Sequence, residues 1–231
     1  MAKWIFILVA VTFLTACSDS TEQAKETLLS RIPEKKYVEF DNLQEFPGNV
    51  VCGEYRSADP TRGGKRFQRF IVSGEWVENR PSAEDWQIFC SEDASAALFS
   101  TFGIGPLEDS ATYLPQIQKD LMLFNSALAV YLTDTFSLPS TEQGLDALVT
   151  ATAGPPLPLK FNPDGYLAAV PTDPWNRPYI YERDGLSGGV AQEYNIYTLG
   201  ADGVVGGKGK DADVGTKHLK YLDLITRQDS E

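Results

Sequence analysis

The chain from Pro115 to about Thr135 has the periodicity of an amphipathic helix. Its apolar side chains are spaced three and four residues apart, at Ile117, Leu121, Phe124, Leu128 and Tyr131. This spacing places them on one face of an α-helix. The face is widened by further apolar residues, which is typical of a helix that packs on a sheet.

The first half of the chain has the pattern of β-strands. Its apolar and aromatic runs KYVEF, VVCGEY and RFQRFIVSGEWV are separated by the turn-forming sequences FPGN and DPTRGG. The following segment, PSAEDWQIFC, spaces Trp86 and Phe89 as a short helix would. We therefore expect a small α+β module over residues 36–93.

Two stretches lack a clear period. Residues 17–35 are polar with only a short amphipathic end, so we expect a tether there. Residues 94–112 are rich in small residues and are interrupted by glycine and proline, so we expect a linker.

The C-terminal part combines a short helix with a hairpin. Ser140 and Gln143 have the spacing of a capping box, and Leu145 and Leu148 follow on the buried side of that helix. After a proline-rich segment, the runs YIY and EYNIYTL flank a glycine-rich turn, which predicts an antiparallel hairpin. Over residues 113–231 we expect a helix packed on a small antiparallel sheet, so the fold class of the whole chain is α+β.

Composition excludes several functions. The chain has 231 residues and a formal net charge of −12, which repels phosphate backbones, so nucleic acid is not an expected partner. His218 is the single histidine, which excludes multi-histidine metal sites and leaves little room for histidine-based catalysis. Paired carboxylates can hydrolyse glycosides, but here the acidic residues gather in a glycine-rich loop without an aromatic-lined cleft. We therefore expect a protein that is not an enzyme.

The N-terminus has the pattern of an export signal. Lys3 is followed by an apolar run, Trp4–Leu14, and then by small residues before a cysteine. The sequence Leu14-Thr15-Ala16-Cys17 closely resembles the lipobox of bacterial lipoproteins. This resemblance implies that residues 1–16 are a signal peptide and that Cys17 is lipidated. The protein would then face the periplasm on a lipid anchor. In such lipoproteins the residue after the cysteine directs sorting, and Ser18 favours the outer membrane. The alternative is an ordinary secretory peptide with a chance cysteine.

Two cysteines remain once Cys17 is assigned to lipid. In an oxidising compartment a pair such as Cys52 and Cys90 usually forms a disulfide. Two free buried thiols are the alternative.

The segment Leu199–Gly215, LGADGVVGGKGKDADVG, concentrates six glycines and three aspartates. Calcium prefers six to eight hard oxygens from carboxylates and carbonyls, and glycine lets a chain curl tightly enough to supply the carbonyls. The segment fits neither an EF-hand nor a phosphate-binding loop. By composition alone, a calcium loop and a solvated turn both remain open.

Another short motif, Asp173-Pro174-Trp175, has the composition of a turn. Proline fixes the backbone, and the aspartate can accept hydrogen bonds from turn amides. We expect a structural role for it.

Three ordered motifs carry a resemblance to a known family. The segments STEQGLDALV, GYLAAVPTDPWNRPYIY and EYNIYTLGADGVVGGKGKDADVG resemble the C-terminal domain of the major pseudopilin of type II secretion systems, over Tyr113–Gly215. The departures within them are small: Asn176 and Thr198 replace a glycine and a serine of the family pattern.

The resemblance implies a Ca²⁺ site in the glycine-rich loop. Matched by position, Asp202 and Asp213 are the expected carboxylate ligands and Asp211 is a third. The main-chain carbonyls of Leu199 and Val205 are expected to complete the site.

The chain also departs from that family at its start. A lipobox, a tether and a disulfide-bonded module replace the leader and long apolar helix from which pseudopilins build their filament. We therefore expect a lipid-anchored envelope protein with a calcium-binding pseudopilin-like domain. Its partners would be proteins of a secretion or pilus-type machine. The alternative is a calcium-stabilised periplasmic lipoprotein that binds an unrelated protein or glycan.

Overall fold

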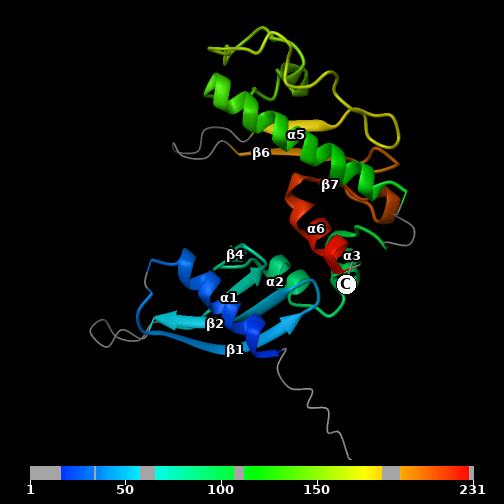
Figure 1. Cartoon of the computed structure of the whole chain (residues 1–231). Coiled ribbons are helices and arrows are strands. Elements are labelled where there is room, and N and C mark those ends of the chain that lie inside the picture. Colours follow the sequence, from blue (N-terminus) through cyan, green and yellow to red (C-terminus); the bar gives the residue numbers. More distant parts are fainter. Residues whose placement is uncertain (1–16, 34, 58–65, 107–111, 184–192, 229–231) are drawn as a thin grey trace, which may run out of the picture. The chain divides into compact units, whose positions relative to one another are not determined.

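The computed structural model describes residues 17–33, 35–57, 66–106, 112–183 and 193–228 (Figure 1). The chain divides into two compact units, residues 1–92 and 93–231. The expected signal peptide, residues 1–16, lies outside the described residues.

The first unit contains a four-stranded antiparallel sheet in the order β1-β2-β3-β4. The strands are β1 (Val38–Phe46), β2 (Val50–Ser57), β3 (Gln68–Ser73) and β4 (Trp76–Glu78), and the helices of this unit are α1 (Cys17–Arg31) and α2 (Ala83–Phe89). The β-like runs and the short helix expected from the sequence are thus present. Ser82 caps α2 by accepting a hydrogen bond from the amide of Asp85, at 3.0 Å.

Helix α1 packs across one face of this sheet (Figure 1). Ala24 and Leu28 on this helix, and Ile32 directly after it, are spaced four apart and are buried against the ring of Phe70 and neighbouring strand residues. The stretch that the sequence indicated as a tether, residues 17–35, is therefore largely a helix that completes a hydrophobic core. The sequence did not indicate a helix here because most of the helix surface is polar. One narrow apolar stripe is nevertheless enough to bury one side of the helix.

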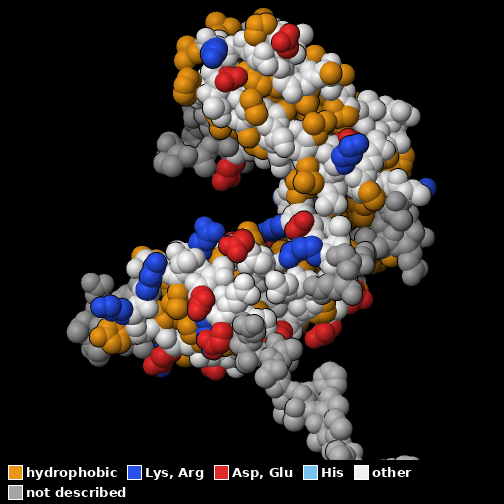
Figure 2. Space-filling view, viewed as in Figure 1, with side chains coloured by type: hydrophobic (Ala, Val, Ile, Leu, Met, Phe, Trp, Pro, Cys, Tyr) orange, Lys and Arg blue, Asp and Glu red, His pale blue; other side chains and the backbone are white. Residues whose placement is uncertain are grey.

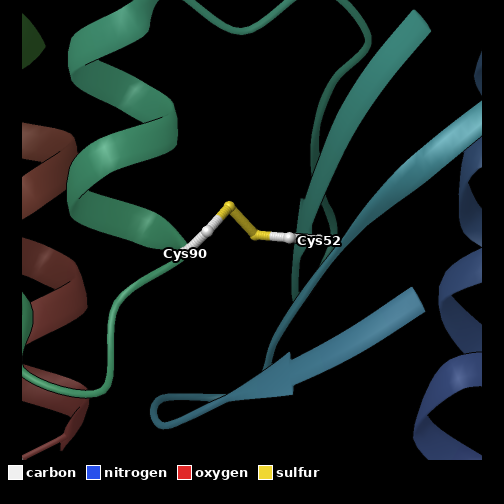
Figure 3. The surroundings of a disulfide bond; sticks show 2 residues. All are labelled: Cys52 and Cys90. Atoms are coloured by element: carbon white, nitrogen blue, oxygen red, sulfur yellow. A yellow bond between two sulfur atoms is a disulfide. The ribbon is translucent and has the colours of Figure 1, made fainter. Parts of the chain in front are cut away.

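A disulfide joins Cys52 on β2 to Cys90 at the end of α2 (Figure 3). This confirms the expected pairing; the Cα atoms are 6.0 Å apart. Because successive strand residues face opposite sides of a sheet, Cys52 lies on the face opposite the one that carries Val51 against α1. The ring of Trp76 also stacks on that of Phe89 at 4.8 Å, so α2 is fixed to the second face.

The second unit combines helices with a three-stranded antiparallel sheet in the order β5-β6-β7. Its helices are α3 (Ala94–Phe102), α5 (Leu114–Thr135) and α6 (Leu219–Gln228), and its strands are β5 (Ile180–Arg183), β6 (Tyr194–Thr198) and β7 (Val214–Gly215). Short 3-10 turns lie between them: η1 (Leu145–Leu148), η2 (Gly209–Asp211) and η3 (Thr216–His218). The β5-β6 hairpin and the long helix α5 are confirmed, and the predicted apolar face of α5 is buried at Ile117, Leu121, Phe124, Leu128 and Tyr131.

The stretch expected as a linker, residues 94–112, contains helix α3, which packs on α6 within the second unit. Its buried side consists of Ala94, Ala97 and Leu98, and small alanines give a weak apolar signal in a sequence. The ring of Phe102 lies 4.8 Å from that of His218, which is itself buried. His218 is thus a packing residue.

Hydrophobic side chains also reach the surface of the second unit. On α5, Met122, Leu123 and Val130 are exposed, and Phe136 follows the helix with 74% of its surface exposed. Figure 2 shows hydrophobic side chains gathered on the visible face of this unit around α5.

Candidate functional site

The Asp173-Pro174-Trp175 turn supports the glycine-rich loop. Asp173 is buried; its Oδ1 accepts hydrogen bonds from the amides of Trp175 (2.9 Å) and Arg177 (2.8 Å). Its Oδ2 accepts one from the hydroxyl of Thr198, at 2.6 Å. The expected structural role of this turn is confirmed, and the bond to Thr198 fixes it to the end of β6, where the loop begins.

Arg177 continues this support into the loop. Its Nη1 donates to the carbonyl of Ala201 at 3.2 Å, and its Nε lies 3.6 Å from Asp173 Oδ2. Gly203 has a φ of +70°, and a Cβ there would come within 2.5 Å of Arg177 Nη1. The positive φ strains any L side chain, so glycine is favoured where the guanidinium packs against the loop.

No separate signal in the sequence indicated this role of Arg177. The Ala201 contact joins residues 24 positions apart, and a single arginine after a turn is common. Only the fold brings them together.

The backbone of the loop closes on itself. The amide of Ala201 donates to the carbonyl of Lys210 at 2.7 Å, which joins the two sides of the loop. Gly200 has a φ of +63°, and a Cβ on it would come within 2.5 Å of the backbone of Asp211. This close approach explains a glycine at that position and gives the segment a compact shape.

The three aspartates have different surroundings. Oδ1 of Asp202 accepts from the amide of Val204, and Oδ2 of Asp213 accepts from the amide of Gly206, both at 2.9 Å. Oδ1 of Asp213 is buried and has no hydrogen-bond partner among the described residues. A buried acceptor without a partner costs about 1–3 kcal/mol, so this oxygen is suited to a cation.

The structure does not gather the carboxylates into one cluster. Over the described residues, no group of three or more His, Cys, Asp and Glu side chains lies close enough together to hold a metal ion. A site in this loop would therefore need main-chain oxygens, such as the expected carbonyls of Leu199 and Val205, beside a smaller number of carboxylates.

His218 is unsuited to metal binding although it lies near the loop. Its Nδ1 accepts a hydrogen bond from the amide of Gly215 at 3.1 Å, and burial lowers the pKa of its imidazole to about 3. The ring is neutral at neutral pH, so its Nε2 carries the proton and has no lone pair for a metal.

Comparisons with known proteins concern the second unit. Residues 108–217 match the family described as type II secretion system (T2SS), protein G. The chain is 46% identical over 96 residues to the type II secretion system core protein G of Pseudomonas aeruginosa, a match that covers 42% of this chain and 65% of that protein. It is 38% identical over 101 residues to the protein of the same name from Vibrio cholerae, covering 44% of this chain and 66% of that protein.

A solved structure is also similar. The major pseudopilin from the type 2 secretion system of enterohaemorrhagic Escherichia coli is 32% identical in sequence, with a TM-score of 0.37, and the match covers 47% of this chain and 86% of that one. The chain spans slightly less than two thirds of the length of the first curated relatives that it matches.

These sequence similarities define the class of the second unit: it contains a pseudopilin-like domain, as the three motifs indicated. The particular relatives are core proteins G of type II secretion. The family match begins at residue 108, so it leaves out the first unit. Across the described residues, no helix combines the length and the apolar character needed to cross a membrane.

Proposed function

We propose that this protein is a lipid-anchored component of the cell envelope that acts in type II protein secretion or a related pilus-type machine. The observation that carries the proposal is the 46% identity over 96 residues to a type II secretion system core protein G. The role is structural: the second unit binds other proteins and performs no catalysis. Exposed apolar residues on α5, including Met122 and Val130, support a binding role, because such patches commonly mark protein interfaces.

Calcium is the cofactor in this proposal. The ligands would be Asp202, Asp213 and Asp211 with the carbonyls of Leu199 and Val205. The unpartnered Oδ1 of Asp213 and the closed, glycine-rich backbone support the assignment. Calcium accepts an irregular cage of many oxygens, whereas magnesium demands a tight octahedron and zinc prefers nitrogen and sulfur.

The anchor is the lipid on Cys17, with the protein facing the periplasm from the outer membrane. Export is supported by the disulfide between Cys52 and Cys90, since disulfides persist in oxidising compartments. One alternative is a calcium-stabilised lipoprotein that binds an unrelated protein or glycan. The observation that supports this alternative is that the first unit lies outside the family match.

The test is crosslinking of the lipidated protein in its own envelope, read by mass spectrometry. We expect crosslinks to components of a secretion or pilus-type machine, and fewer exported proteins in a deletion strain. Met122→Asp, on the exposed face of α5, should weaken these crosslinks, whereas Lys119→Asp, also on that helix, changes charge without removing an apolar contact. Crosslinks only to unrelated envelope proteins, with export unchanged, would support the alternative.

A further inference from the structure

The first unit contains a pocket that the proposed function does not use. Its volume is about 430 Å³, and it opens beyond the end of α1, where the helix stops covering the sheet. Ile32, Val38 and the ring of Tyr55 form an apolar wall. Pockets of this size bind small organic molecules in many proteins.

The opposite side of the pocket is polar and basic. Arg66, Gln68 and Arg80 line it, and none of the described residues that line it is an aspartate or glutamate, although the chain carries 32 acidic residues. Tyr55 and Gln68 are paired across β2 and β3, so they lie next to each other on one face of the sheet.

The two arginines of the pocket differ from other arginines of this unit. Arg56 forms an ion pair with Glu39 at 2.6 Å, and Arg69 stacks over the ring of Trp86 at 4.5 Å. Within the described ranges, no ion pair joins the guanidinium of Arg66 or Arg80 to a carboxylate. The nearby acid Glu78 instead accepts a hydrogen bond from the main-chain amide of Arg80, at 3.0 Å.

The Tyr55 hydroxyl adds a neutral donor. Burial raises the pKa of this hydroxyl, while the charge of Arg80 and a hydrogen bond with Gln68 act in the opposite direction. The group therefore stays protonated at neutral pH. Among the described residues, the polar side offers two positive charges and several hydrogen-bond donors, and no negative charge.

We propose that this pocket binds a small organic carboxylate, with its charge between Arg66 and Arg80 and its apolar group against Ile32, Val38 and Tyr55. Guanidinium groups match carboxylates through paired hydrogen bonds. A singly charged ligand suits a protein of net charge −12 better than a phosphate dianion does. A free organic acid and the C-terminus of a peptide with an apolar last residue both present this chemistry.

The test is calorimetric titration of the intact protein with 3-phenylpropionate and with its neutral amide. We expect the acid to bind at least tenfold more tightly than the amide, and Arg66→Gln or Arg80→Gln to weaken it at least tenfold. Acetyl-Gly-Phe with a free carboxylate distinguishes the sources: tighter binding than phenylpropionate identifies a peptide C-terminus, and weaker binding identifies a free acid.

Arg69→Gln is the matched control. Arg69 follows Gln68 on the same strand but faces the other side of the sheet, so its loss should leave the affinity unchanged. Equal binding of acid and amide, or of inorganic phosphate and acid, would overturn the proposal. The proposal would also be overturned if the Arg66 and Arg80 variants bound the acid with unchanged affinity and only had lower melting temperatures. In that case the two positive charges would act by stabilising the C-terminal end of α1.

Discussion

Asp213 is the residue that best separates a calcium loop from a solvated turn. Its two carboxylate oxygens are unequal: Oδ2 holds the loop through the amide of Gly206, and Oδ1 is buried without a partner. A folded protein rarely leaves such an oxygen unsatisfied unless something else binds it. The loop is thus held by its own backbone and still has an acceptor to offer.

We predict that calcium stabilises the second unit through this loop. A ligand that binds only the folded state, at a concentration one hundred times its dissociation constant, raises the free energy of unfolding by about 2.7 kcal/mol. Calorimetry should show a higher melting temperature in excess calcium than in chelator, and Asp213→Ala or Asp202→Ala should abolish the difference. Asp223→Ala, which removes a carboxylate paired with Arg227 on α6, is the control and should retain it. Identical wild-type curves, with no bound metal by elemental analysis, would refute the site.

His218 gives the second unit a sensitivity to acid. Burial lowers its pKa from the ordinary value of 6.5 to about 3, and Lys217 contributes in the same direction. Between these values the unfolded chain binds a proton that the folded protein does not. Stability is therefore complete above pH 6.5 and falls as the pH drops toward 3.

The measurement is urea unfolding of the wild type and of His218→Asn at pH 7.5 and pH 4.5. Asparagine places an amide oxygen at the position of Nδ1, so it can still accept the hydrogen bond from Gly215, but it does not titrate. We expect the wild type to lose about 2.7 kcal/mol more than the variant between the two pH values. Equal losses in both proteins would show that His218 is not the source of the acid sensitivity.

Among the elements, α2 depends on a covalent bond. It is only seven residues long, and the disulfide from Cys90 to Cys52 closes a loop with a sequence separation of 38. A helix of this length is not stable by itself, so its position against the sheet relies on this bond and on the Trp76–Phe89 stack.

We predict that Cys52→Ser with Cys90→Ser lowers the free energy of unfolding of the first unit by about 4 kcal/mol, since the disulfide limits the entropy of the unfolded chain. Denaturant unfolding with and without a reductant measures this. The reductant should destabilise the wild type and leave the double variant unchanged. A wild type indifferent to reductant would contradict the prediction.

The elements also show what a sequence can reveal. Helix α5 was predictable because large apolar residues such as Leu121 and Phe124 mark its buried face at a regular spacing. Helix α3 was not, because alanines such as Ala97 supply much of its buried surface and carry little hydrophobic signal. Helix α1 was not, because its buried stripe, which includes Ala24 and Leu28, is narrow and the rest of its surface is polar. The loop aspartates followed from a family resemblance, whereas the role of Arg177 depends on a contact that only the folded chain creates.

The whole molecule joins two different units: the second contains the segment that matches a known family, and the first lies outside that match. Similarity to type II secretion proteins begins at residue 108, while the disulfide and the basic pocket lie before it. In the proposed function, the second unit would supply the connection to secretion, and a lipid on Cys17 would place the first unit next to the membrane.

At this scale we predict that Cys17 is lipidated and that the mature protein fractionates with membranes. Cys17→Ser should yield an unprocessed or soluble form, because the acyl chains and the cleavage both depend on that cysteine. Labelling with a fatty-acid analogue, followed by membrane fractionation, provides the measurement, and Cys52→Ser is the control that should stay membrane-bound. Processing and lipid labelling that persist in Cys17→Ser would disprove the anchor.

Helix α1 then determines how far the protein can reach. The helix starts at Cys17 and spans 15 residues, or about 22 Å at 1.5 Å per residue, and it ends as part of a folded core. The same residues as an extended chain would cover about 50 Å. With the lipid on Cys17, no long flexible tether would separate the first unit from the bilayer. It would have to search for its partners in two dimensions, within a thin layer beside the bilayer.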